Sequence, residues 1–237
     1  MQSLWTTFPP QLVLAGSTLY VSQGSIYGLD TRTGKVRRQY AVSGSAALAF
    51  ARGTLYLNVN RHPDSSVQAV RAHDSWALWS YQVAGPLAHA PTLARDGVYV
   101  STTEGVLYAL QARNGRLLWQ QAVGGTSAAQ WPTVAALIGR VLCVGAKSGP
   151  DSILSAYQPA DGALLWSSHL SGTWFSLPIG AAGRVYISDN NGEVSAFRLR
   201  DGQLLWQTAV AAEVQSTAYL SMRPSSIVLL PASSPEP

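Results

Sequence analysis

The segment LYALQARNGRLLW, residues 107 to 119, decides the fold, because LSAYQPADGALLW (154 to 166) and VSAFRLRDGQLLW (194 to 206) repeat it. Each copy is an alternating apolar strand, a turn that ends in Gly and a second strand that ends in Trp. More divergent copies stand at 67 to 79 and 26 to 38. The turn residues are 41, 40, 47 and 40 positions apart, a period typical of a propeller blade: Gly34, Ser75, Gly115, Gly162 and Gly202.

A further pair of strands precedes each copy, so the repeating unit has four strands. Apolar and polar residues alternate over these pairs, which Gly, Asn, Asp and Pro bound, as in half-buried antiparallel strands. The Asn-Gly and Asp-Gly dipeptides of the later copies suit type I′ hairpin turns. We therefore expect an all-β propeller of four-stranded antiparallel blades, with the preceding pairs at 12–22, 47–59, 91–101, 132–145 and 177–188.

The two ends of the chain leave the number of blades open. Five complete blades are predicted, with Leu4-Trp5 as the end of an earlier strand and 217–230 as a strand pair without a hairpin after it. These pieces form a partial sixth blade of three strands, or the chain is a fragment of a larger propeller. Residues 1–230 are expected to be one domain and the Pro/Ser-rich residues 231–237 a disordered tail.

Composition excludes several classes. Of the 237 residues 47% are hydrophobic and 12% charged, which rules out a disordered chain. No apolar run approaches the length of a membrane span, so no membrane insertion is expected. The net charge of +4 has one dense basic cluster, residues 32–38, which favours a solvated outer strand over a site for an anionic partner; no nucleic acid is expected. Cys143 is the only cysteine and is predicted to be a buried apolar residue.

The Trp that ends each unit has a structural explanation. A large aromatic repeated once per blade can pack neighbouring blades together, so Trp79, Trp119, Trp166 and Trp206 are predicted to be inter-blade packing residues. Arg38 stands in place of Trp in the first copy. The junction after the first blade is therefore expected to be the weakest.

These repeats resemble the pyrroloquinoline-quinone-binding-like β-propeller repeat of the quinoprotein alcohol dehydrogenase-like superfamily, over nearly the whole chain. That family's tryptophan-docking motif runs Ala, any residue, Asp, three residues, Gly, three residues, Trp. The last three copies meet it at Ala109, Gly115 and Trp119, at Ala156, Gly162 and Trp166, and at Ala196, Gly202 and Trp206. Asp30 occupies the Asp position in the first copy only. We expect the loss of Asp in the other copies to weaken the docking hydrogen bonds. The residues found there are Arg71, Gln111, Gln158 and Arg198.

The resemblance implies two possible functions. One branch contains pyrroloquinoline-quinone-dependent dehydrogenases with a Ca²⁺ site and often a vicinal disulfide, which a chain with one cysteine cannot form. The other branch contains non-catalytic scaffolds of the cell envelope, which bind protein partners through one face. We expect the second, without cofactor and not an enzyme; a dehydrogenase fragment is the alternative. The family implies a periplasmic or other extracytoplasmic location if an export signal is missing upstream, since this chain shows none.

Catalytic and metal-binding groups are not predicted, because no Ser-His-Asp order, metal-ligand spacing of histidines or phosphate-binding loop emerges. The segments that differ between copies are the ones that enter the inner strands, where propellers bind their partners. A protein or peptide partner is expected there, and Trp131 and Trp174 also suit a small ligand such as a sugar, or simple packing. The predicted partner face comprises His89, Gln130, Trp131, Trp174, Phe175 and Gln215.

Overall fold

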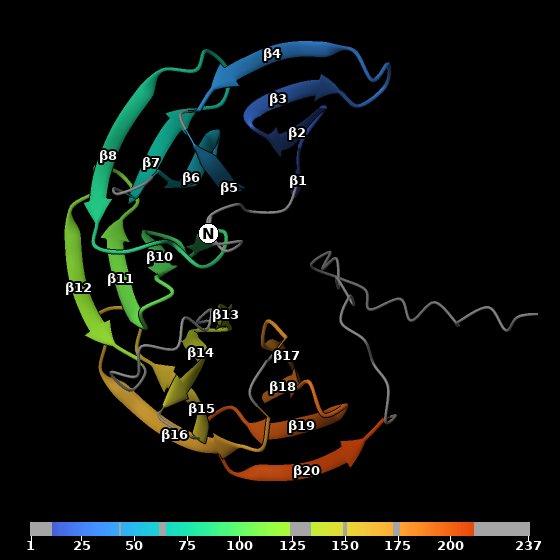
Figure 1. The fold of residues 1–237 in the computed structure, drawn as a ribbon, viewed down its shortest axis with the longest axis vertical. Helices are drawn as coiled ribbons and strands as arrows, with labels where there is room; N and C mark the ends of the chain where they lie inside the picture. Colours follow the sequence, from blue (N-terminus) through green and yellow to red (C-terminus); the bar gives the residue numbers. More distant parts are fainter. Residues whose placement is uncertain are drawn as a thin grey trace, which may run out of the picture.

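The computed structural model describes residues 11–42, 44–61, 65–123, 134–148, 151–172 and 176–210. It confirms the all-β prediction: twenty strands form five four-stranded antiparallel sheets. The sheets follow one another around an arc, with the first strand of each sheet toward the inside and the fourth on the outer rim (Figure 1). The described residues therefore make five propeller blades.

The strands match the repeat boundaries seen in the sequence. Blade 1 holds β1 (Gln11–Ala15), β2 (Thr18–Gln23), β3 (Ser25–Asp30) and β4 (Val36–Ala41), and blade 2 holds β5 (Ser45–Ala51), β6 (Thr54–Asn60), β7 (Ser65–Arg71) and β8 (Ala77–Val83). Blade 3 holds β9 (Thr92–Leu93), β10 (Gly97–Ser101), β11 (Val106–Gln111) and β12 (Leu117–Ala122). Blade 4 holds β13 (Val134–Ile138), β14 (Val141–Ser148), β15 (Asp151–Tyr157) and β16 (Leu164–Leu170), and blade 5 holds β17 (Ile179–Ala181), β18 (Arg184–Ser188), β19 (Glu193–Arg198) and β20 (Leu204–Ala209).

This connectivity gives the arc two distinct faces. In an antiparallel meander the first and third turns lie at one end of the blade, and the second turn lies at the other end with the connection to the next blade. A groove between blades 2 and 3 shows this, since the first turns at Arg52 and Arg95 line it together with the third turn at Arg113. We call the side of the first and third turns the turn face, and the opposite side the connection face.

The third turns differ from the predicted type I′ geometry. In blade 3 the backbone N–H of Gly115 donates to the carbonyl of Gln111 at 2.8 Å, which closes a wider loop, and a β-bulge follows Ala109. Gly115 has φ +72°, whereas Asn114 is not in the left-handed region that a type I′ turn requires at both positions. Instead, the Asn114 side chain accepts the N–H of Arg116 at 3.1 Å. The Asx residue thus stabilises the turn through its side chain.

Three tryptophans join neighbouring blades by the same contact. Trp79 Nε1 donates to the carbonyl of Ala112 at 2.9 Å, Trp119 to that of Pro159 at 3.0 Å and Trp166 to that of Leu199 at 2.8 Å. The acceptor is always the backbone carbonyl that follows the motif's Asp position. Loss of the Asp therefore leaves the docking bond intact, contrary to our expectation.

The glycine of the docking motif makes room for the indole ring. A Cβ atom built on Gly115 would lie 2.5 Å from the Trp79 ring, and one on Gly162 would lie 2.7 Å from the Trp119 ring. Both distances are below van der Waals contact, and both glycines have a positive φ that other residues rarely adopt. Gly is therefore required at these positions both by the space that the indole ring occupies and by the backbone conformation.

The junction between blades 1 and 2 uses a different pair of residues. Arg38 Nη1 donates to the carbonyl of Ala72 at 2.9 Å, the position equivalent to the other docking acceptors. The hydroxyls of Tyr20 and Tyr40 donate to the same carbonyl at 3.1 and 2.7 Å. Ser75 replaces the docking glycine at φ 68°, where no indole ring excludes its side chain. This junction thus has Arg38 and Ser75 where the other junctions have a Trp and a Gly.

The first and last blades carry the two unmatched halves of this contact. A Cβ atom on Gly34 in blade 1 would meet nothing within 4 Å. Trp206 in blade 5 packs against Tyr186 with the rings tilted by 46° and is 43% exposed, and its indole donates to no described residue. The predicted partial sixth blade, with Leu4-Trp5 and residues 217–230, lies outside the described residues, as does the predicted tail at 231–237.

Candidate partner-binding face

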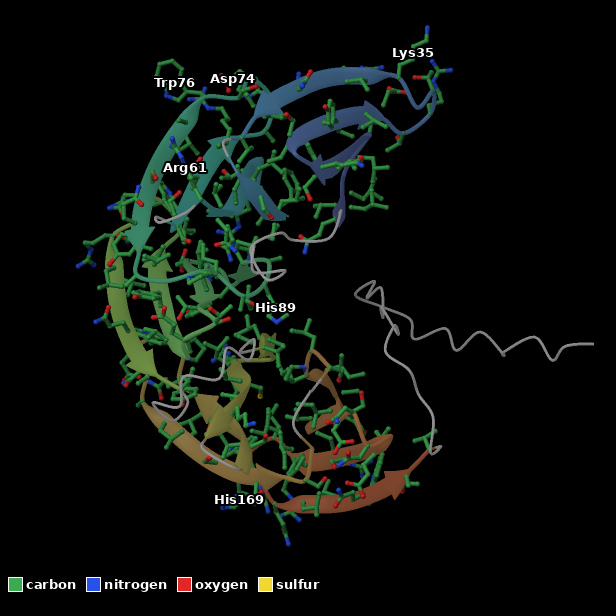
Figure 2. All side chains as sticks on the ribbon, viewed as in Figure 1. Lys35, Arg61, Asp74, Trp76, His89 and His169 are labelled. Atoms are coloured by element: carbon green, nitrogen blue, oxygen red, sulfur yellow. The ribbon has the colours of Figure 1, made fainter. Side chains whose placement is uncertain are left out.

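Of the residues predicted for the partner face, the structure describes His89 alone, and it places this residue on the connection face. His89 lies in the connection between β8 and β9, on the inner side of the arc (Figure 2). Gln130, Trp131, Trp174, Phe175 and Gln215 lie outside the described residues. The geometry of this face is therefore built from His89 and its neighbours.

Two asparagines at the end of β6 hold the connection that carries His89. Asn60 Nδ2 donates to the carbonyl of Leu87 at 2.9 Å, and Asn60 Oδ1 accepts the Leu87 N–H at 2.8 Å. Asn58 Nδ2 donates to the carbonyl of His89 at 2.5 Å. Leu87 also forms a β-bridge with Thr102. The connection is thus fixed between blades 2 and 3, and the position of His89 is preorganised.

This cluster contains two polar atoms without a partner. Asn58 Oδ1 and His89 Nε2 are buried and make no hydrogen bond with any described residue. Burial lowers the pKa of His89 from 6.5 to about 4, because the imidazolium would lose its hydration there. The side chain is accordingly neutral at pH 7. Unpaired buried polar atoms are costly in native proteins, and these two retain hydrogen-bonding capacity that the described residues do not use.

A second polar network lies on the same face in blade 5. Ser171 Oγ donates to Glu193 Oε2 at 2.5 Å, and Gln207 Nε2 donates to the same carboxylate oxygen at 2.7 Å. Asp189 Oδ1 accepts the backbone N–H groups of Asn191 and Glu193 at 2.9 and 3.0 Å. The acidic side chains here support a tight turn and the adjacent connection.

Chemistry beyond binding has little support in the described residues. Within them, no group of three or more His, Cys, Asp and Glu side chains could hold a metal ion. Cys143 is buried between blades 4 and 5, and burial raises the pKa of its thiol to about 12. None of the described residues form a helix long and apolar enough to cross a bilayer.

Asn58 and Asn60 were not among the residues predicted for this face. Both lie in TLYLNVN, where two asparagines interrupt an otherwise apolar strand. Both are buried, with exposed fractions of 0% and 6%. Polar residues in a buried strand are a usable signal, because such groups require hydrogen-bond partners. Their partners come from a connection 27 to 31 residues later in the chain, which the strand pattern does not reveal.

Two family models match the chain. The family model described as outer membrane protein assembly factor BamB matches residues 2–150, and the model of the EMC1 N-terminal β-propeller domain matches residues 79–233. BamB of Yersinia pestis is 31% identical over 136 residues, which cover 55% of this chain and 33% of the relative. The chain thus spans about a third of that relative's length.

Two further comparisons cover more of the chain. Tetrathionate hydrolase of Acidithiobacillus ferrooxidans is 25% identical over 223 residues, covering 84% of this chain and 44% of the relative. The crystal structure of BamB from Moraxella catarrhalis superposes with a TM-score of 0.66 at 20% identity, covering 83% of this chain and 62% of that one. That likeness shows the fold. Because the first family model spans well over half of the residues, the chain belongs to the BamB family of repeat β-propellers.

Proposed function

We propose that this chain is a non-catalytic propeller scaffold that binds a protein segment on its connection face during assembly of outer membrane proteins. The family match supports the process, since the relatives carry the name of an assembly factor. The family also supports an extracytoplasmic location. The observation that carries the binding mode is the pair of unpaired polar atoms, Asn58 Oδ1 and His89 Nε2.

A polypeptide backbone has the chemistry that this pair lacks. Each peptide unit offers one N–H donor and one carbonyl acceptor. Asn58 Oδ1 can only accept, whereas a neutral imidazole nitrogen donates or accepts according to its tautomer. A bound segment therefore carries donors and acceptors suited to both atoms. The fixed connection around Leu87 limits the entropy that binding costs.

Site-specific photocrosslinking tests which face binds. A photoreactive residue replaces the exposed Glu104, on the second turn of blade 3, and in a matched variant the exposed Arg113, on the third turn of the same blade. Both variants are expressed with an export signal in the periplasm of a Gram-negative host. We expect crosslinks to outer membrane assembly components from position 104 and not from position 113.

Substitution of the cluster provides the second arm. Asn58→Ala combined with His89→Ala should abolish the crosslinks from position 104 while the circular dichroism spectrum of the protein stays unchanged. Equal crosslinking from positions 104 and 113, or crosslinking that survives the double substitution, would contradict the proposal.

We also propose that the chain acts without pyrroloquinoline quinone. Cys143 is the only cysteine, so the chain cannot form the vicinal disulfide that is often found beside this cofactor in the quinone-dependent branch. Titration with the quinone and Ca²⁺, followed by absorbance and by dye-linked alcohol oxidation, should show neither binding nor turnover.

The small-ligand alternative rests on Trp131 and Trp174, and replacing both by Ala would abolish sugar binding if it is correct.

A further inference from the structure

Among the described residues, most basic side chains lie on the turn face, where they outnumber the acidic ones: Asp30, Asp74, Asp96, Asp161 and Asp201. In four of the five blades an exposed arginine lies in the first turn or at its end, beside the inner strand: Arg52, Arg95, Arg140 and Arg184, which begins β18. The topology places these four around the inside of the arc on one face (Figure 1). Nothing in the period-2 pattern of the strands requires a cation there.

The third turns add more cations to the same face. Arg32 and Lys35 belong to the third turn of blade 1, and Arg113 and Arg116 to that of blade 3. These four side chains are exposed, and none forms an ion pair with a described residue. Arg71 and Arg198, by contrast, pair with Asp74 and Asp201 inside their own turns at 3.1 and 3.0 Å.

The connection face has the opposite character. Among the described residues its basic side chains are Arg61 and Lys147, whereas Glu104, Asp189 and Glu193 lie on the same side. The charge asymmetry therefore runs along the axis of the arc. It creates a positive potential over one broad face, which attracts anionic surfaces.

Apolar side chains border the cations of the turn face. Trp76, on the third turn of blade 2, is 66% exposed and lies at the outer edge beside Asp74 (Figure 2). Leu164, which begins the outer strand of blade 4, is 58% exposed. Trp76 belongs to blade 2 and Leu164 to blade 4, so neither lies in the first or the last blade of the described arc, and the ends of the arc do not explain their exposure. Cations next to exposed Trp and Leu are typical of surfaces that bind the headgroup region of a bilayer.

We propose that the turn face docks on an anionic lipid surface, with the arginines on lipid phosphates and Trp76 at the headgroup level. The groove between blades 2 and 3, where Arg52, Arg95 and Arg113 outnumber Asp96, offers a site for a headgroup phosphate. The exposed Trp and Leu favour a bilayer over a nucleic acid. The backbone of a nucleic acid presents charged phosphates but no adjacent apolar layer for these side chains. Docking by this face leaves the connection face free.

Vesicle flotation with the full chain tests the inference. Vesicles of phosphatidylglycerol mixed with phosphatidylcholine should bind at low ionic strength, and vesicles of phosphatidylcholine alone should not. Arg95→Gln with Arg113→Gln should weaken binding roughly thirtyfold, since each cation near the surface contributes separately. The matched variant, Arg61→Gln with Lys147→Gln, removes the same charge from the opposite face and should bind nearly as well as the unaltered chain.

Three outcomes would overturn the inference. The first is equal loss from the two double variants, which would show that only net charge matters. The second is binding to both kinds of vesicle, and the third is tighter binding to a short duplex DNA than to the anionic vesicles at the same ionic strength. Because the crosslinking experiment uses the connection face, failure here and failure of the scaffold proposal are distinguishable.

Discussion

The docking of Trp119 on blade 4 can be tested by adding a single methyl group. Gly162→Ala places a Cβ atom 2.7 Å from the indole ring, in a turn whose φ is +75°. The left-handed conformation alone costs about 1–2 kcal/mol for Ala. Overpacking against the ring costs about 1–3 kcal/mol more, and displacing the indole loses its bond to Pro159, worth about 1 kcal/mol. The expected total is about 3–6 kcal/mol.

Gly34→Ala is the matched control for this substitution. Gly34 has φ +68°, but a Cβ atom at this position would meet nothing within 4 Å, so only the conformational cost of about 1–2 kcal/mol applies. Urea unfolding followed by tryptophan fluorescence gives both free energies by linear extrapolation. Equal destabilisation by the two substitutions would refute the reasoning, because it would mean that the indole contact adds nothing at Gly162 or that an equal contact exists at Gly34.

Three further predictions address other sites. Arg38→Trp should destabilise the chain unless Ser75→Gly accompanies it, and urea unfolding should show the double variant about 1–3 kcal/mol more stable than Arg38→Trp alone. Cys143 should not react with a thiol reagent at pH 8 until the protein unfolds, because burial raises its pKa to about 12. His89 has a pKa of about 4 in the fold and 6.5 when unfolded, so the unfolded chain binds more protons and stability should fall from pH 7 to pH 4 by up to about 3 kcal/mol. His89→Gln should remove this dependence, and the exposed His73→Gln should preserve it.

The periodic features of the fold were predictable from the sequence, because they depend on residues close together in the chain. The Gly and Trp positions of the last three copies located each third turn and each outer strand within a few residues. The type of turn was not predictable, since the bulge after Ala109 and the side-chain bond of Asn114 depend on strand register. Dipeptides such as Asn-Gly suit several hairpins, and register selects among them.

The candidate site was predictable only in part. His89 was identified from its place at the entry to an inner strand, but its neutral, buried state depends on contacts with another blade. Asn58 and Asn60 hold that connection from 27 to 31 residues earlier in the chain. The remaining predicted residues of the partner face stay a prediction, because they lie outside the described residues.

The repeat alone determined the all-β class, the five complete blades and the role of the Trp residues in packing neighbouring blades together. Those features follow from the alternation of apolar and polar residues along each strand and from the Gly and Trp that recur in the copies. Tertiary structure decided how charge is distributed over the molecule and which docking residues have a partner. Arginines some 40 residues apart share one face only because the blades are antiparallel meanders arranged in the same sense around an arc. Among the described residues, Gly34 receives no indole ring and Trp206 donates to no docking carbonyl, whereas the other docking glycines and tryptophans have these partners.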